Sequence, residues 1–266
     1  MKSKIRFPVV IICISLLICC FTSCSSVEPE LKVSLLPSAS DSLSSFLDKN
    51  NDSDLVIPEA VGSAFFKDSV FIGDSVTLSF KNYVTKQRNN NFECLSNAEF
   101  LCSGSMSYYN ATLDPDEKDA IHPKYKGETV LVEDGVKLIG AKKAFIMLGM
   151  NDFCLFPFDQ DIENAETLIK RIIEKNPDIE IYVQSVTPII ASKEHGKFTN
   201  DNVDEFNKYL FEMCEKNGWT YIDINQNLKN ENNCLDDDYC SDPDSQGIHL
   251  KQEACEIWVD YLVSLF

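Results

Sequence analysis

The chain has 266 residues, of which 44% are hydrophobic, and its 42 acidic and 24 basic side chains give a net charge of −18 at neutral pH. This length suits one domain with a full hydrophobic core. The acidic excess argues against a protein that binds nucleic acid or an anionic membrane surface through its charge.

The first 24 residues have the pattern of a secretory signal. Three basic residues within positions 2–6 precede an apolar run over 9–21, and small residues follow it. The run is too short for a comfortable membrane span, so we expect residues 1–24 to be removed. The ending Thr-Ser-Cys-Ser-Ser resembles a bacterial lipoprotein signal, which predicts acylation of Cys24 and anchoring to the outer face of the cell membrane. Ordinary secretion and a retained single-span anchor are the alternatives.

Residues 25–62 are rich in Ser, Asp, Asn and Pro and show no sustained hydrophobic period. This composition predicts a flexible tether. Residues 63–266 show no internal repeat and are expected to form one domain.

Short apolar runs alternate with longer amphipathic patterns in residues 63–266. Five runs predict strands, near 70–72, 100–102, 144–148, 179–186 and 221–224. Apolar residues at helical spacing predict helices over about 76–84, 162–173, 203–214 and 254–262. This alternation predicts an α/β fold, a three-layer α/β/α sandwich around a parallel sheet of about five strands.

Three polar turns directly follow predicted strands. They are Gly73-Asp74-Ser75, Ser103-Gly104 and Gly149-Met150-Asn151-Asp152. Ligands bind at the carboxyl ends of the strands in an open parallel sheet, so we expect these turns to converge on one edge. Taken alone, Ser75 fits two roles, a nucleophile or the N-cap of the following helix.

A serine nucleophile needs a base within hydrogen-bond reach. His122 and His195 lie in polar loop segments, away from any predicted strand end. His249 immediately precedes the terminal helix, where a loop can fold back over the strand edge, and it is the preferred base.

In order and context, these turns and Gly247-Ile248-His249-Leu250 resemble the GDSL/SGNH hydrolases, over roughly residues 68–266. The resemblance implies a flavodoxin-like sheet and an ester hydrolase that uses neither metal nor cofactor. It implies that Ser75 is the nucleophile and that His249 is the general base and then the acid. It also implies an oxyanion hole formed by the backbone N–H groups of Ser75 and Gly104 and the side-chain amide of Asn151.

One position departs from the family pattern. The family usually places an aspartate three residues before the histidine, where this chain has Gln246. An uncharged amide cannot stabilise an imidazolium as a carboxylate does. We expect Asp244 to orient His249 instead, with Asp242 as the second choice. The alternatives are a backbone carbonyl in this role, or a non-catalytic carbohydrate- or lipid-binding lipoprotein.

The acidic loop over 236–244 also raises a calcium hypothesis. Asp242, Asp244, Gly247 and Glu253 fall in the frame of a calcium-binding loop. Because Gln246 fits that frame poorly, solvated loop acids are the preferred interpretation.

Seven cysteines follow position 24, an odd number that cannot pair completely within one chain. Cys154, Cys214 and Cys255 lie in apolar contexts typical of core residues. Cys234 and Cys240 flank an acidic loop and would pair in an oxidising compartment. No Cys/His spacing of the zinc type occurs, so no structural metal site is expected.

The substrate is the least constrained part of the prediction. Phe153, Phe156 and Phe158 follow Asn151, where they either line the site or pack under a loop. Secretion points to an extracellular ester, with acetyl groups on carbohydrate or cell-wall polymer as the first choice and short-chain acyl esters as the second. The sequence does not indicate the oligomeric state.

Overall fold

The computed structural model describes residues 62–266, which contain a central sheet of five parallel strands. Its order is β2-β1-β5-β6-β7. The strands are β1 (Ser69–Gly73), β2 (Glu99–Cys102), β5 (Lys143–Met147), β6 (Glu180–Gln184) and β7 (Thr220–Ile222). All five predicted strands are thus confirmed. The predicted signal segment 1–24, its Cys24 and residues 25–61 of the tether lie outside the described residues.

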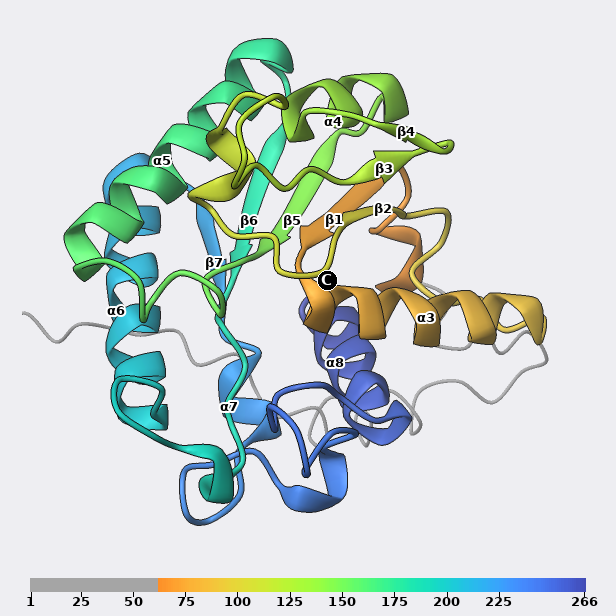
Figure 1. Ribbon diagram of the computed structural model, residues 1–266. Coiled ribbons are helices and arrows are strands. Elements are labelled where there is room, and N and C mark those ends of the chain that lie inside the picture. Colours follow the sequence, from red (N-terminus) through yellow and green to blue (C-terminus); the bar gives the residue numbers. More distant parts are fainter. Residues whose placement is uncertain (1–61) are drawn as a thin grey trace, which may run out of the picture. The chain divides into compact units, whose positions relative to one another are not determined.

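Helices cover both faces of this sheet (Figure 1). The helices α4, α5 and α6 lie on one face, and α3 and α8 lie on the other. Their bounds are α3 (Ser75–Asn89), α4 (Val132–Ile139), α5 (Phe158–Lys175), α6 (Asn200–Asn217), α7 (Asn225–Leu228) and α8 (Gln252–Ser264). The three-layer α/β/α sandwich is therefore confirmed. Within residues 62–266, no helix combines the length and the hydropathy needed to cross a bilayer.

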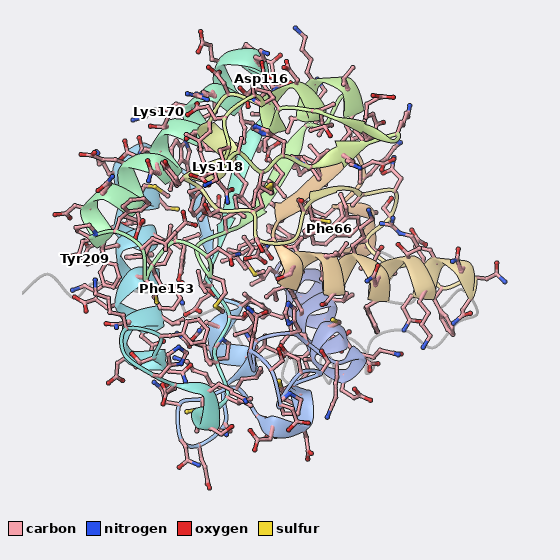
Figure 2. All side chains as sticks on the ribbon, in the orientation of Figure 1. Phe66, Asp116, Lys118, Phe153, Lys170 and Tyr209 are labelled. Carbon is pink, nitrogen blue, oxygen red and sulfur yellow. The ribbon has the colours of Figure 1, made fainter. Side chains whose placement is uncertain are left out.

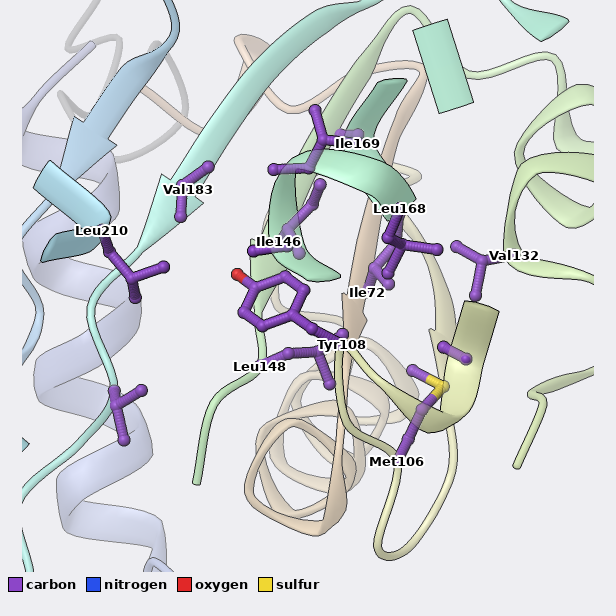
Figure 3. Close-up of a cluster of buried hydrophobic side chains, with 14 of the residues drawn as sticks. Ile72, Met106, Tyr108, Val132, Ile146, Leu148, Leu168, Ile169, Val183 and Leu210 are labelled. Carbon is purple, nitrogen blue, oxygen red and sulfur yellow. The ribbon is translucent and has the colours of Figure 1, made fainter. Parts of the chain in front are cut away.

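Alternation along the strands divides the core into two layers. On the side of α5, Ile72, Ile146 and Val183 are fully buried together with Tyr108 from the loop after β2 (Figure 3). On the opposite side, an aromatic row crosses four neighbouring strands. Its rings lie 4.6–5.4 Å apart between centroids, and its members are Phe100, Phe71, Phe145 and Tyr182.

The four-residue helix α7 and two further small features escaped the sequence patterns. The helix α4 has only eight residues, which is too few turns for a clear period. The hairpin of β3 (Lys124–Tyr125) and β4 (Glu128–Thr129) has two residues in each strand, so it shows no alternation. Neither α4 nor the hairpin changes the edge of the sheet at which the polar turns meet.

Candidate active site

The turn after β1 places Ser75 at the start of a helix. Asp74, rather than Ser75, is the N-cap of α3, because its Oδ1 accepts a hydrogen bond from the N–H of Val76 at 2.9 Å. The N-cap interpretation of Ser75 is therefore wrong, because the helix already includes Ser75 and aspartate caps a helix as well as serine does. Ser75 is the first residue of the helix and is half-buried, at the positive end of the helix dipole.

The turns after β1, β2 and β5 are packed together without space between them. A Cβ atom on Gly73 would lie 2.6 Å from the carbonyl oxygen of Met147, so only glycine fits there. The Gly73 carbonyl accepts a hydrogen bond from the N–H of Ser103 at 3.2 Å. The predicted convergence of these turns on one edge is thus seen directly.

Gly104 lies in an exposed turn over 103–106, which the N–H of Met106 closes by donating to the carbonyl of Ser103 at 3.2 Å. A Cβ atom on Gly104 would meet no other atom within 4 Å. Packing within the described residues therefore does not require glycine here, and its backbone faces open space in which a ligand can approach.

Asn151 links all three turns. Its Nδ2 donates to Asp74 Oδ2 at 3.2 Å and to the carbonyl of Met106 at 3.1 Å. Both hydrogens of this amide therefore have acceptors within the protein. The side chain is fixed in orientation, half-buried, between the turns after β1 and β2.

The neighbouring Asp152 anchors the loop after β2. It is fully buried, and its two oxygens accept hydrogen bonds from the backbone N–H groups of Tyr108 and Tyr109 at 3.0 and 3.1 Å. Burial raises the pKa of Asp152 to about 6, although these hydrogen bonds act in the opposite direction.

Asp74 has a similarly perturbed carboxyl group. Burial raises its pKa to about 7, with a further increase from Asp152, while the hydrogen bond from Val76 and the charge of His249 act to lower it. A geometric observation agrees with this influence, since Ser79 of α3 lines one pocket together with Leu250, the residue after His249. The loop that carries His249 therefore lies beside the opening turns of α3, although His249 is 175 residues further along the chain than Asp74.

His249 has a carboxylate partner, and that partner is Asp242. The distance from His249 Nδ1 to Asp242 Oδ2 is 2.8 Å, with both side chains about one-fifth exposed. Since a carboxylate only accepts, Nδ1 carries the proton, which leaves Nε2 as the acceptor in the neutral ring. Asp242 Oδ1 accepts from the backbone N–H groups of Ile248 and His249 at 3.1 and 3.0 Å.

The expectation that Asp244 orients His249 is therefore corrected in favour of Asp242. The N–H groups of Ser245 and Gly247 both donate to the carbonyl of Asp242, at 2.9 and 3.2 Å. This tight turn leaves Asp244 and the side chain of Gln246 exposed. The N–H of Gln246, and not its amide, meets the Asp242 carboxylate, at 3.2 Å.

Asp242 is ionised at neutral pH. Its burial acts to raise the pKa, but hydrogen bonds from the ring and backbone of His249 and from the thiol of Cys240 outweigh that effect and hold it at about 2. These hydrogen bonds use the carboxylate of Asp242, which is the first residue of the calcium-loop frame. Over residues 62–266, no group of three His, Cys, Asp or Glu side chains is placed to hold a metal ion.

The other predicted residues fall into packing roles. Phe153, labelled in Figure 2, is buried and stacks on Phe198 at 5.7 Å between ring centroids. Phe158 packs against Phe206 of α6. Phe156 packs edge-on against a neighbouring tyrosine ring, 5.1 Å away. The alternative that the phenylalanines pack under a loop therefore holds for Phe153 and Phe158.

None of the seven cysteines within residues 62–266 forms a disulfide bond. Cys234 and Cys240 are buried and unbridged, and each thiol contacts an oxygen at 3.4 Å, in Asn232 and Asp242 respectively. Burial of Cys214 and Cys255 agrees with their prediction as core residues, whereas Cys154 is half-exposed and lines a pocket.

Sequence reasoning assigned no role to three residues that the structure brings to this edge. Asp74 and Asp152 fix Asn151 and the loop after β2, and an aspartate directly before a helix is a recognisable capping signal. His195 lies in the loop after β6 and lines the same pocket as Cys154. The sequence predicts that His195 lies away from the strand ends, because no pattern shows how a loop of that length folds back.

Comparison with known proteins gives a consistent assignment. Residues 71–257 match the model of the GDSL-like Lipase/Acylhydrolase family. No curated protein matches the chain.

Solved structures share the fold at low sequence identity. A GDSL-like lipase from Bacteroides thetaiotaomicron VPI-5482 is 14% identical, with a TM-score of 0.52 over 77% of this chain and 94% of its own. The acetyl xylan esterase AlAXEase is 15% identical, with a TM-score of 0.53 over 74% and 98%. The periplasmic domain of a lipopolysaccharide acetyltransferase from Salmonella ser. Paratyphi A is 16% identical, with a TM-score of 0.52 over 74% and 83%.

Proposed function

The chain belongs to the GDSL-like lipase/acylhydrolase family of ester hydrolases, and within it we propose a serine esterase that uses Ser75, His249 and Asp242. The observation that carries this proposal is the 2.8 Å contact between His249 Nδ1 and Asp242 Oδ2, in a loop that lines one pocket with α3, the helix that begins at Ser75. A serine, a histidine whose Nε2 can accept a proton and a partly buried carboxylate are the parts of a nucleophilic relay.

In the proposed reaction, His249 Nε2 takes the proton of the Ser75 hydroxyl as Oγ attacks the ester carbonyl. The resulting imidazolium is stabilised by the Asp242 carboxylate and then protonates the departing alcohol. Water, activated by the same imidazole, cleaves the acyl-enzyme and releases the acid. The low pKa of Asp242 supports this role, because the carboxylate keeps its charge throughout.

The developing oxyanion would be stabilised by the N–H groups of Ser75 and Gly104 and by Asn151 Nδ2. The first N–H lies in the opening turn of α3, and Gly104 faces open space. The two amide hydrogens of Asn151 now donate to Asp74 and to the carbonyl of Met106. One of them would also donate to the oxyanion. A protonated Asp74 competes less for that hydrogen than an ionised one.

For the substrate, we propose acetyl or other short-chain esters of carbohydrate. The acetyl xylan esterase that shares the fold supports this choice, although at 15% identity it supports the fold far more than the specificity. The non-catalytic alternative rested on the lack of a charged partner for His249. That premise is not met, since Asp242 supplies the charge.

We also propose that the enzyme is a secreted lipoprotein held at the outer face of the cell membrane by acylated Cys24, with residues 25–62 as its tether. The sequence pattern of residues 1–24 supports this placement. Replacement of Cys24 by serine should release the protein from the membrane fraction, and an unchanged distribution would count against the anchor.

The proposed activity is tested with 4-nitrophenyl acetate and the full chain purified in detergent. Ser75→Ala should reduce turnover by roughly 10⁴-fold or more. Ser79→Ala is the matched control, because Ser79 lies one turn further along α3 and its hydroxyl donates to the Ser75 carbonyl. Equal loss in both variants, or retained turnover in folded Ser75→Ala, would contradict the assignment.

A further inference from the structure

A pocket of about 710 Å³ lies beside the site, between the loop after β6 and the loop that carries His249. Figure 1 shows these two segments, teal and blue, running together below the sheet, and the N–H of Ile190 joins them by donating to the carbonyl of Gly247 at 3.1 Å. The volume is in the range of small-molecule sites. Cys154, three residues after Asn151, forms part of its wall.

The pocket adjoins the part of the site from which the alcohol would leave. Ser245 and Gln246 line it, and the N–H of Gln246 donates to the same Asp242 oxygen that accepts from the His249 ring. The imidazolium must lie close to the departing alcohol in order to protonate it. Ser75, His249 and Gly104 are not among its lining residues, so the pocket flanks the reacting groups and does not enclose them.

The lining is cationic in a strongly acidic protein. Lys193 and Lys197 line the pocket, and among residues 62–266 neither of them forms a salt bridge. Glu194, which lies between them, also lines the pocket and keeps its charge, but its Oε1 accepts hydrogen bonds from the N–H and side-chain amide of Asn200, at 2.6 and 2.9 Å, and from neither lysine. The ammonium groups are therefore available to a ligand.

Lys193 is held in place by close packing. Gly247 has a φ of +73°, and a Cβ atom on it would lie 2.6 Å from Cγ of Lys193. The stem of Lys193 thus runs across the backbone two residues before His249. A larger residue at position 247 would displace both the lysine and the loop.

Lys197 has only a weak counter-charge. Its charge lowers the pKa of the buried Asp161 and of Cys154, which places it near both groups. Burial nevertheless raises the pKa of Asp161 to about 7, so that this carboxyl group is only partly ionised in neutral solution and is largely protonated in mildly acidic solution.

The rest of the lining suits a sugar ring. Phe198 and His195 offer ring surfaces 5.5 Å apart, and hydroxyl and amide side chains stand nearby at Ser192, Ser245 and Gln246. Aromatic faces beside a few hydrogen-bonding groups match the apolar faces and hydroxyl edges of a saccharide. We propose that this pocket binds the alcohol moiety of the substrate and that this moiety is an anionic sugar, whose carboxylate or phosphate is held by Lys193 and Lys197.

This inference rests on the proposed esterase function. Two measurements distinguish a failure of the inference from a failure of that function. The first compares kcat/KM for methyl glucoside, methyl glucuronoside and methyl glucoside 6-phosphate, each acetylated at the same hydroxyl. The wild-type chain should prefer the anionic esters by roughly tenfold. The double variant Lys193→Gln/Lys197→Gln should lose this preference, whereas Lys208→Gln, an exposed lysine of α6, should keep it.

The second readout is calorimetric titration of the Ser75→Ala variant with methyl glucuronoside and glucose 6-phosphate, which needs no hydrolysis. Binding that the two lysine substitutions abolish supports the inference even if the chain hydrolyses no ester. Equal kcat/KM for neutral and anionic esters, or a preference that survives the double substitution, overturns it and leaves the esterase function standing. A preference for only one of the two anions identifies carboxylate or phosphate as the group bound.

Discussion

At the residue scale, the arrangement around His249 depends on one carboxylate with several duties. Asp242 accepts hydrogen bonds from the His249 ring, from three backbone N–H groups and from the Cys240 thiol. Such a carboxylate both orients the imidazole and holds the loop in shape. Asp242 thus has the role that the family usually assigns to an aspartate three residues before the histidine, where this chain has Gln246.

Asp242→Asn should therefore lower kcat on 4-nitrophenyl acetate by about 10³–10⁴-fold, since the amide neither fixes the tautomer of His249 nor stabilises its charge. Asp244→Asn is the matched control, two residues away and exposed. It should change kcat by less than about twofold. A similar loss in both variants would indicate damage to the loop rather than to the relay.

Asn151→Ala should lower kcat by about 10²–10³-fold with a smaller change in KM, as expected for loss of one oxyanion donor. A melting curve is the necessary companion measurement, because Asn151 also joins the turns of Asp74 and Met106. A mild kinetic effect in a folded variant would assign Asn151 a structural role alone.

The residue roles were only partly predictable from sequence. The positions of Ser75 and Asn151 follow from turns after predicted strands, because a parallel sheet brings those turns to one edge. The position of His249 follows from its place directly before the predicted terminal helix. The choice of Asp242 over Asp244 depends on how the turn over 242–247 closes. That closure is decided by backbone hydrogen bonds that no spacing rule reveals.

At the element scale, α8 carries the His249 loop and is attached to the sheet by Trp258. This side chain is fully buried, stacks on Phe80 of α3 at 4.1 Å, and donates from Nε1 to Gln184 of β6 at 2.8 Å. The helix was predictable from its apolar period, but its contacts with α3 and β6 were not, because they join segments 74 or more residues apart.

Trp258→Ala should reduce the free energy of unfolding by about 3–5 kcal/mol, through the cavity it leaves and the unpaired Gln184. Ile257→Ala is the control on the same helix, because that side chain is only half-buried. It should cost clearly less. Urea denaturation measures both, and equal losses would show that α8 is not anchored chiefly through Trp258.

At the scale of the whole molecule, charge is distributed unevenly between surface and interior. Side chains such as Asp116, Lys118 and Lys170 point away from the ribbon (Figure 2). Inside, Asp161 of α5 is fully buried, and among the described residues neither carboxyl oxygen has a hydrogen-bond partner. Burial raises its pKa from 3.8 to about 7, with a further contribution from Asp152.

A carboxyl group whose pKa is higher in the folded state favours folding when it is protonated. Its contribution is complete below about pH 4 and is lost as the pH rises through about 7. Asp161→Asn should therefore raise Tm at pH 8, by about 2–4 °C for each kcal/mol of unfavourable ionisation free energy removed, with a clearly smaller gain at pH 5. Asp159→Asn, exposed in the same turn of α5, should shift Tm slightly at both pH values. A gain for Asp161→Asn that is equal at pH 5 and pH 8 would contradict the role of its ionisation.

The most direct test of the whole account is covalent labelling with a fluorophosphonate, followed by peptide mass spectrometry. An activated serine reacts with this probe whatever its natural substrate, because only the nucleophile and its base are required. The account predicts one adduct, on Ser75, formed at least about 100-fold more slowly in Asp242→Asn. An adduct on a different serine, or a folded chain that takes no label, would contradict the assignment of Ser75, His249 and Asp242 as the catalytic relay.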